Sequence, residues 1–285
     1  MKILLTYLLF VFFIITAYAQ STNNFDVVVE IGVCTNFTNS ELLKESGYSF
    51  VEEGVGRLLM LNNDDEEFKK ILIDLKDNPL PIYACNGFIP KELKSVGPDA
   101  VHDEILAFAE TAFRRADMVG VKIIVFGSGG SRSIPEGFDR DVARLQFIDL
   151  CKRMGPVAER YGVTVVIEPL NTKECNFINS VAEGGELLKV VNHPNIQLLA
   201  DIYHMKMEDE GHESIVNYGK FIKHVHIAEK QDRAVPGTNN EDFRAYFNAL
   251  EEIGYEGKLS VEARWANLQL QAPEVIKTIL YQYKN

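Results

Sequence analysis

The feature that most constrains the fold of this 285-residue chain is a regular alternation of strand-like and helix-like segments. Eight apolar or β-branched runs recur along the chain, and segments of helical periodicity lie between them. The seven intervals average about 33 residues, close to the length of one strand–helix unit of an eight-fold barrel. The runs end near Val33, Glu52, Cys85, Phe126, Glu168, Asp201, Ile227 and Glu262.

Helix boundaries inside these intervals carry the expected capping signals. Apolar residues recur at three- and four-residue steps from Ile105 to Val119, and Gly120 follows as a natural helix end. Residues 180–183 read Ser-Val-Ala-Glu, a capping box that marks the start of another helix. Helices therefore begin and end between the predicted strands.

Together these signals predict an α/β protein with one (β/α)₈ TIM barrel domain. A 46% share of hydrophobic residues is sufficient for a core of that size. The alternative is a doubly wound open sheet, which a glycine fingerprint after the first strand would favour. Residues 33–36 read Val-Cys-Thr-Asn and contain no such fingerprint.

The first nineteen residues have the composition of a signal peptide. Lys2 supplies the positive start, residues 3–17 are almost unbroken apolar sequence, and Ala17-Tyr18-Ala19 is a typical cleavage site. We therefore expect residues 1–19 to be removed and residues 20–285 to form the barrel of an exported protein, periplasmic or secreted. An uncleaved N-terminal anchor is the alternative. The apolar stretch is short for a membrane span, so no stable membrane insertion is expected after cleavage.

The charge balance argues against a nucleic-acid partner. The chain has 29 basic and 41 acidic residues, a net charge of −12, which becomes −13 without Lys2. A free-standing nucleic-acid binder needs a basic face that displaces phosphate counterions. The four cysteines, at positions 34, 85, 151 and 175, are too few for a disulfide scaffold, although export would allow them to oxidise.

Four consecutive predicted strands end on side chains that bind metal ions. Glu168, Asp201, His226 and Glu262 close strands five to eight. Alternation of side chains along a strand lets all four point inward at the mouth of the barrel. Three carboxylates would repel one another without a cation, and the set suits one hard or borderline divalent ion such as Mn²⁺, Mg²⁺ or Co²⁺.

At this point the sequence resembles a known family, the xylose isomerase-like TIM barrels, which include sugar isomerases and epimerases and family 2 AP endonucleases. Within it, the pattern is most similar to the ketose 3-epimerase and hydroxypyruvate isomerase branch. The resemblance covers nearly the whole chain after residue 19. The segments that carry it are Glu168-Pro169-Leu170-Asn171, Asp201-Ile202-Tyr203-His204, His224-Val225-His226-Ile227-Ala228-Glu229 with Arg233 and Pro236-Gly237, and Val261-Glu262-Ala263.

The resemblance implies a role for each matching residue. Glu168, Asp201, His226 and Glu262 would hold one divalent ion, and Glu168 and Glu262 would also exchange protons with carbon on opposite sides of a sugar. His204 and Arg233 would bind substrate oxygens, and Glu174 would support the substrate and the catalytic carboxylate. The segment from His226 to Arg233 is slightly longer than in many members. Dimers and tetramers are common among barrels similar to this one, which makes a homo-oligomer possible, but the sequence does not show the oligomeric state.

These implications predict an isomerase, either a sugar epimerase or an aldose–ketose isomerase. It would transfer protons through an enediolate on an unphosphorylated ketose or keto-sugar, since phosphorylated sugars are mostly intracellular. The same enediolate can expel a β-substituent, so a lyase or dehydratase acting on a keto-sugar or 3-keto-glycoside is the alternative. A non-catalytic sugar-binding barrel is a further one. The abasic-site nucleases use extra histidines that residues 84–87 do not supply.

Four secondary features have open interpretations. His224 is expected beside the metal residues or in the core, and Glu52 lines the pocket or is structural. Residues 127–132, Gly-Ser-Gly-Gly-Ser-Arg, fit neither phosphate-loop pattern and are predicted to form a flexible loop on the substrate side. Trp265 either walls the sugar site or packs on the barrel rim.

Overall fold

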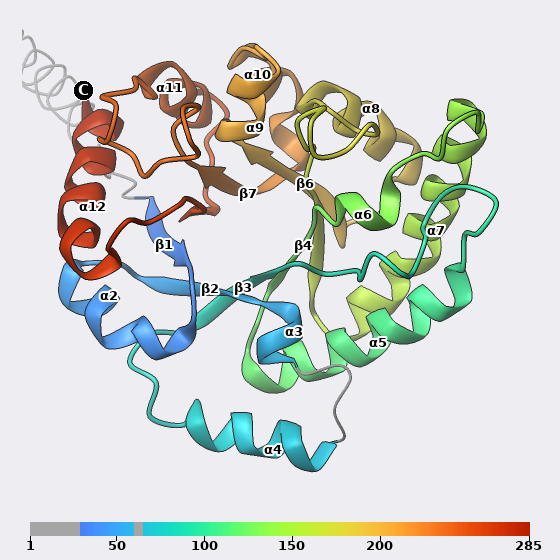
Figure 1. Ribbon diagram of the computed structural model, residues 1–285, viewed down its shortest axis with the longest axis horizontal. Helices are drawn as coiled ribbons and strands as arrows, with labels where there is room; N and C mark the ends of the chain where they lie inside the picture. The colour runs from blue at the N-terminus through green and yellow to red at the C-terminus, as the bar shows by residue number, and fades with distance from the viewer. Residues whose placement is uncertain (1–28, 60–64) are drawn as a thin grey trace, which may run out of the picture.

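The eight predicted strands close into one parallel barrel. The computed structural model describes residues 29–59 and 65–285, so the predicted signal peptide lies outside the described residues. Each strand pairs with its neighbours in chain order, and β1 pairs with β8 to complete the circle (Figure 1). The predicted (β/α)₈ fold is confirmed. The strands are β1 (Glu30–Cys34), β2 (Phe50–Gly54), β3 (Ile82–Asn86), β4 (Ile123–Phe126), β5 (Thr164–Ile167), β6 (Ile196–Asp201), β7 (Ile222–Ile227) and β8 (Lys258–Val261).

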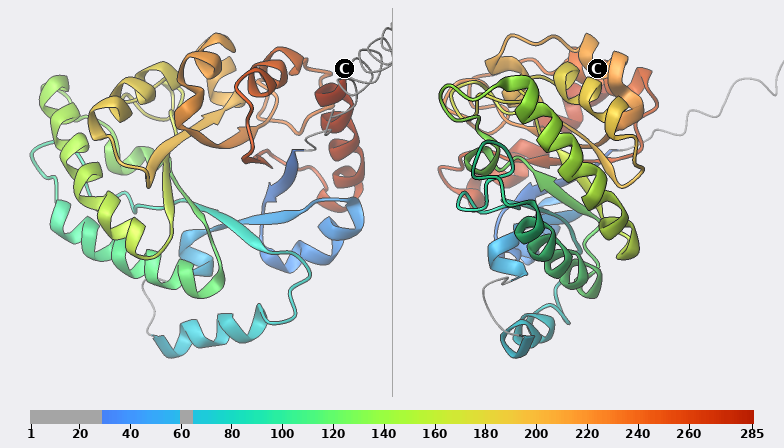
Figure 2. Two further views of the ribbon diagram at one scale, coloured as in Figure 1. Left: turned by 180° about the vertical axis from the view of Figure 1, so that it is seen from behind. Right: turned by 90° about the vertical axis from the view of Figure 1, so that its right-hand side faces the viewer.

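Helices surround the barrel and pack against their neighbours in the ring (Figure 2). Short helical turns at the strand ends add to this outer layer, and α4 lies at its edge (Figure 1). The helices are α2 (Ser40–Ser46), α3 (Val55–Leu58), α4 (Asp65–Asp74), α5 (His102–Val119), α6 (Gly129–Arg132), α7 (Arg140–Arg160), α8 (Val181–Val191), α9 (Ile202–Met207), α10 (Glu213–Tyr218), α11 (Arg244–Glu252) and α12 (Leu268–Lys284), with 3₁₀ turns η1 (Phe37–Asn39) and η2 (Gly219–Phe221). None of the helices in the described part of the chain is long and apolar enough to cross a membrane.

The predicted helix boundaries are correct at the positions that carried a capping signal. α5 ends at Val119, and Gly120 adopts a left-handed φ of 83°. Ser180 caps α8 by accepting a hydrogen bond from the Glu183 backbone N–H at 3.0 Å. The Glu183 carboxylate accepts from the N–H of Asn179 rather than from that of Ser180, so the return contact of the capping box is displaced by one residue.

Most of the hydrophobic core lies between the barrel and its helices. Outward-facing strand residues pack against the apolar faces of the helices around the ring. A chain of aromatic rings crosses this layer through Phe88, Phe113, Phe126, Phe147 and Phe177, with neighbouring centroids 5.3 to 5.7 Å apart. This shell fixes the direction of every strand, and so fixes where the strand ends meet.

The interior of the barrel has an apolar half and a polar half. The apolar half comes from β3 to β6 and consists of Ala84, Ile123, Val125, Val166 and Leu199. The polar half comes from β7, β8 and β2, where His224, His226, Ser260 and Glu52 are all buried. Because interior positions alternate along each strand, Val166 and Leu199 stand two residues before Glu168 and Asp201.

Aromatic side chains fill the barrel interior toward the amino ends of its strands. The Phe50 ring packs edge-on against Tyr83, with centroids 5.4 Å apart, and both rings lie near His224. A Cβ on Gly32 would stand 2.4 Å from the Phe50 ring, so glycine is required opposite it. The Lys258 ammonium lies over the Tyr83 ring at 4.5 Å and forms an ion pair with Glu30. This packing closes one end of the barrel.

Candidate functional site

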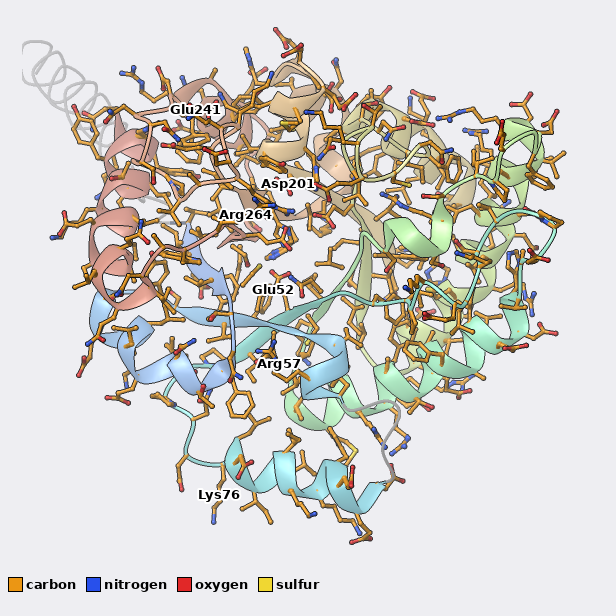
Figure 3. All side chains as sticks on the ribbon, in the orientation of Figure 1. Glu52, Arg57, Lys76, Asp201, Glu241 and Arg264 are labelled. Atoms are coloured by element: carbon orange, nitrogen blue, oxygen red, sulfur yellow. The ribbon has the colours of Figure 1, made fainter. Side chains whose placement is uncertain are left out.

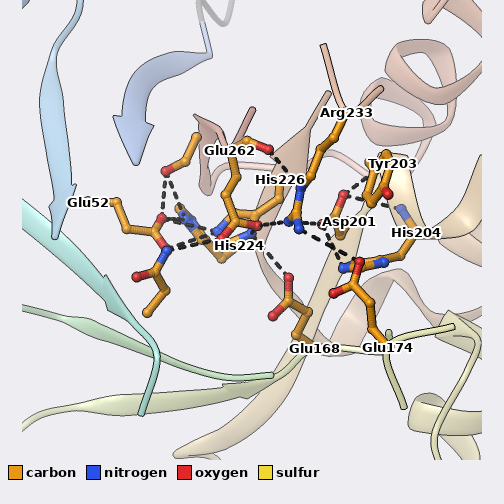
Figure 4. A network of polar contacts seen from close by, with 12 residues as sticks. Glu52, Glu168, Glu174, Asp201, Tyr203, His204, His224, His226, Arg233 and Glu262 are labelled. Atoms are coloured by element: carbon orange, nitrogen blue, oxygen red, sulfur yellow. Dashed lines mark hydrogen bonds and ion pairs between the residues drawn. The ribbon is translucent and has the colours of Figure 1, made fainter. Parts of the chain in front are cut away.

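Four of the predicted site residues meet at the carboxyl ends of the strands. Glu168 follows β5, Asp201 ends β6, His226 lies in β7 and Glu262 follows β8. One ligand-type atom from each lies within 4.8 Å of the others. Asp201 is labelled above Glu52 in Figure 3, and Figure 4 shows the four side chains converging. The alternation of side chains along the strands correctly predicted that these four residues converge.

His226 stands at the centre of this cluster. Its Nδ1 atom is 3.1 Å from Glu262 Oε2 and 3.3 Å from Glu168 Oε1. Asn86, at the end of β3, donates from Nδ2 to the other oxygen of Glu262 at 3.1 Å. The cluster therefore presents one imidazole nitrogen and three carboxylates toward a shared space.

The donor set fits a divalent cation. Glu168 Oε1 and Asp201 Oδ2 are buried and have no hydrogen-bond partner among the described residues. A buried carboxylate oxygen without a partner is costly, and coordination of a cation would remove that cost. Three carboxylates and one imidazole are a usual set for Mn²⁺, Mg²⁺ or Co²⁺.

Arg233 brings a positive charge next to the carboxylates of Asp201 and Glu262. Its guanidinium contacts the Glu262 carboxylate, lies 3.6 Å from Asp201 Oδ2, and stacks 4.7 Å over the Tyr203 ring (Figure 4). Asp232 and Arg233 both have positive φ values, 60° and 51°, a conformation that non-glycine residues seldom adopt. The chain thus holds Arg233 over the cluster in spite of local strain.

His204 and Glu174 lie beside the cluster, where the resemblance placed them. His204 Nε2 is 3.5 Å from Asp201 Oδ2, and its Nδ1 accepts from the backbone N–H of Asn171 at 3.1 Å. Asn171 also donates from Nδ2 to Glu174 at 2.9 Å. Glu174 is 41% exposed, whereas His226 is fully buried, so the site faces solvent on the Glu174 side.

Burial and opposing charges shift the titration of these groups in the metal-free protein. Burial raises the pKa of Glu168, and it raises the pKa of Asp201 to about 6 despite the nearby Arg233. Burial alone would raise the pKa of Glu262, but His226 and Arg233 lower it. Burial would lower the pKa of His226, yet the surrounding carboxylates hold it well above its ordinary value. The cluster strongly favours a positive charge at its centre.

The glycine-rich segment after β4 supports Glu168, and the predicted flexible loop is wrong for residues 129–132. These residues form α6, and Arg132 is fully buried. Arg132 donates from Nη2 to the backbone carbonyl of Glu168 at 2.5 Å. A Cβ on Gly127 would stand 2.2 Å from Glu168 Oε2, so glycine makes room for this carboxylate. A glycine directly after β4, the strand beside the one that precedes Glu168, was the signal available in the sequence.

Glu229 is a buried carboxylate whose role the sequence did not indicate. It accepts backbone N–H groups from Gly237 at 2.8 Å and Asn239 at 2.6 Å. Glu229 therefore holds the loop that carries Arg233 in place.

Trp265 packs against the barrel core, which supports the structural interpretation of that residue.

Glu52 and His224 form a second polar layer beneath the cluster. Glu52 is fully buried and lies near the centre of the view in Figure 3. His224 lies 2.8 Å from Glu52 Oε2 and packs edge-on against the His226 ring, with centroids 5.2 Å apart, in keeping with its deeper position on the strand. Cys34, at the end of β1, has its sulfur within 4.8 Å of donor atoms of Glu52 and His226. All four cysteines are free thiols, and three of them are buried.

A closed barrel with acidic and imidazole side chains gathered at the carboxyl ends of its strands has the arrangement found in enzymes of the TIM barrel class. More narrowly, the chain belongs to the xylose isomerase-like TIM barrel family, whose model matches residues 40–280. The family predicted from the strand-end motifs is thus confirmed.

Individual relatives narrow the class of reaction. The chain is 32% identical to L-ribulose 3-epimerase of Methylomonas over 56% of this chain and 55% of that protein. It is 27% identical to 3-dehydro-D-guloside 4-epimerase of Escherichia coli over 78% of this chain and 84% of that protein. The solved structure of 3-keto-D-glucoside 4-epimerase from E. coli has the same fold, with a TM-score of 0.74 at 22% identity, covering 89% of this chain and 99% of that one.

These relatives confirm the predicted isomerase and epimerase class at the level of the family. The alignment with the ribulose epimerase spans about half of that protein's length, so the activity of the whole chain is taken up below as a proposal. None of the relatives named above is a lyase, and they give the elimination alternative no support.

Proposed function

We propose that this protein is a metal-dependent sugar epimerase or isomerase acting on an unphosphorylated ketose or keto-sugar. The observation that carries the proposal is the convergence of Glu168, Asp201, His226 and Glu262, with two buried carboxylate oxygens that lack hydrogen bonds. The names of the relatives support a sugar as substrate.

Glu168, Asp201, His226 and Glu262 would hold the ion, in agreement with the donor set. When bound, a divalent cation supplies Lewis-acid stabilisation of the negative charge that develops on adjacent substrate oxygens during proton removal. The buried walls of the site keep water away from that charge, because His226 and Asp201 are at most 2% exposed.

Glu168 and Glu262 would move the protons. They approach His226 from β5 and β8, on either side of the strands that carry Asp201 and His226, so a sugar bound between them can meet a carboxylate on each face. One carboxylate removes the proton next to the carbonyl, leaving an enediolate, and the other returns a proton. Return to the opposite face of the same carbon gives an epimer, and return to the neighbouring carbon gives an isomer.

His204, Arg233 and Glu174 would bind the sugar hydroxyls at the rim of the site. His204 Nε2 is buried and has no hydrogen-bond partner among the described residues, so it is available to a substrate oxygen. Arg233 is 20% exposed and already faces Glu262 and Glu174. Such a mixed donor and acceptor rim suits a polyol.

Export would determine the form of the substrate. The cleavage site after Ala19 and the resulting periplasmic or secreted location remain proposals, as does assembly into a homo-oligomer. An exported enzyme would meet free sugars or glycosides rather than sugar phosphates. N-terminal sequencing of the protein recovered from the producing cell tests the cleavage site, and Gln20 is the expected first residue.

The decisive experiment is turnover in D₂O with the Mn²⁺-loaded protein and a panel of ketoses and keto-glycosides. We expect deuterium next to the carbonyl with the sugar skeleton intact. Glu168→Gln and Glu262→Gln should each lower the rate by about 10²- to 10⁴-fold, since each removes an acid–base group. Loss of an aglycone would instead indicate a lyase, and no deuterium uptake on any substrate would refute the proposal.

A further inference from the structure

We propose that Glu52 is a positioning residue that fixes the ring of His226, so that Nδ1 faces the metal position. This inference rests on the proposed function, because it concerns how the chain prepares one ligand of that metal. Glu52 lies on β2, across the barrel from the four clustered residues, and none of the roles assigned above includes it.

The two nitrogens of His226 face different partners. Nδ1 faces Glu262 and Glu168, at 3.1 and 3.3 Å. Nε2 faces Glu52, at 3.0 Å from Oε1 and 3.1 Å from Oε2. The ring therefore bridges the cluster and Glu52, and Figure 4 shows it between them.

Both ring nitrogens face carboxylates in the metal-free protein, and a cation bound at Nδ1 would select one tautomer of the neutral imidazole. A carboxylate only accepts hydrogen bonds, so the nitrogen that faces Glu52 carries the proton. A metal ligand must instead offer a lone pair, which leaves Nδ1 free for the ion. A carboxylate behind a ligating histidine fixes the ring orientation and raises the basicity of the ligating nitrogen.

Glu52 is itself held in place from two other strands. Ser260 on β8 donates from Oγ to Glu52 Oε2 at 2.7 Å, and His224 Nε2 on β7 lies 2.8 Å from the same oxygen. Glu52, His224, Ser260 and His226 are all fully buried. Water therefore does not compete for these contacts, and the carboxylate has little freedom to turn away from His226.

The neighbouring residue provides a matched control. Glu53 follows Glu52 on β2 and is 1% exposed, but its carboxylate accepts backbone N–H groups from Phe37 and Gly54, both at 2.8 Å. Glu53→Gln thus removes an equally buried carboxylate from the same strand without touching His226. Any effect of a weakened β2 is common to both variants, whereas the charge lost from Glu53 is one that faces Arg57 at 3.4 Å and not His226.

The test is the affinity of the purified full-length chain for Mn²⁺, which isothermal titration calorimetry measures. We expect Glu52→Gln to weaken Mn²⁺ binding by about 10- to 100-fold with one site retained, the range typical for loss of a carboxylate behind a metal-binding histidine. Glu53→Gln should bind within about 2-fold of wild type. Glu52→Asp, which keeps a carboxylate, should recover part of the affinity. Ser260→Ala leaves the Glu52–His226 contact in place and should weaken binding less than Glu52→Gln.

The Mn²⁺ affinities of these variants either support or refute the positioning role of Glu52. Equal binding by Glu52→Gln and wild type would overturn the positioning role while leaving the proposed function standing. If Glu52→Gln does not fold, Glu52→Asp decides in its place, because its shorter side chain draws the carboxylate back from His226 Nε2, and an affinity equal to that of wild type refutes the proposal. If Co²⁺ loaded into Glu52→Gln shows a changed ligand-field spectrum with one donor fewer, Glu52 is a ligand rather than a positioning residue. Failure of the wild type to bind any of Mn²⁺, Mg²⁺ and Co²⁺ removes the proposed function and this inference together.

Discussion

Single residues at the site combine a structural contact with a chemical one. Asp201 uses Oδ1 to accept the N–H of Tyr203 at 2.8 Å, which caps α9, and its Oδ2 is left without a hydrogen bond at the cluster. Gly127 contributes only the absence of a side chain, which the Glu168 carboxylate requires. A substitution at either position therefore affects the local fold and the cluster together.

Asp201→Asn separates the two tasks of Asp201. Asparagine is a good N-cap, so α9 should keep its capping contact and the metal-free protein should melt close to wild type. Mn²⁺ binding should weaken by about 100-fold or more, because a ligand is lost and not merely a group behind it. Calorimetric titration and thermal unfolding with EDTA measure the two effects. Asp201→Ala, the control, should also lose about 1 kcal/mol of metal-free stability, and equal Mn²⁺ affinity in Asp201→Asn would contradict the assignment.

The sequence predicted that the four side chains converge but not which residues lie behind them, and the reason is the distance along the chain. Glu168, Asp201 and Glu262 were found because a strand end in a barrel has a fixed direction. Glu52 stayed ambiguous because its partners His224 and Ser260 lie 172 and 208 residues away. A strand pattern shows that a residue points inward, but it does not show which inward residue it will meet.

At the scale of single elements, capping and close packing determine where strands and helices lie. The predicted start of α8 and end of α5 hold because Ser180 and Gly120 act within one turn of the chain. Residues 129–132 were mispredicted because α6 depends on burial of Arg132 against Glu168, a contact between two neighbouring strand ends. Local capping signals predicted helix ends correctly, whereas contacts between separate elements could not be predicted from the sequence.

Gly32→Ala tests the closed end of the barrel. The added methyl group would meet the Phe50 ring, and overpacking of this kind costs about 1–3 kcal/mol. The control is Gly56→Ala in α3, where a Cβ meets nothing within 4 Å. That variant should be neutral or slightly stabilising, since alanine favours helix. Urea unfolding of both variants measures the difference, and equal stability would show that β2 yields without cost.

Ser180→Ala should destabilise the protein by about 1 kcal/mol through loss of the α8 cap. The Ser180 hydroxyl accepts the N–H of Glu183, and alanine leaves that donor unpaired. Ser180→Asp keeps an acceptor and should retain the stability of wild type. Urea midpoints compare the three proteins, and a Ser180→Asp variant as weak as Ser180→Ala would contradict the capping account.

For the whole molecule, the proposed ion would make the free energy of unfolding depend on the metal concentration. Ligand binding to the folded state alone stabilises it by about 2.7 kcal/mol at a concentration 100 times the Kd. For a chain of this size that corresponds to a rise in Tm of about 5–10 °C.

We therefore expect EDTA to lower the Tm of the Mn²⁺-loaded protein by that amount and re-addition of Mn²⁺ to restore it. Differential scanning calorimetry measures the shift, with Asp201→Asn as the variant that should show little of it. A Tm that is indifferent to both EDTA and Mn²⁺ would mean that the four residues do not hold an ion.

The packing of Phe50 and Tyr83 with the Lys258–Glu30 pair also bears on the route by which a substrate would reach the site. With that end filled, the sugar of the proposed function would reach Glu168 and Glu262 from the carboxyl ends of the strands, and its product would leave by the same route. In a reversible reaction, the starting sugar and its product would then enter by the same route and bind the same site. Kinetically, the epimer formed should compete directly with the starting sugar, raising its apparent KM without lowering the limiting rate.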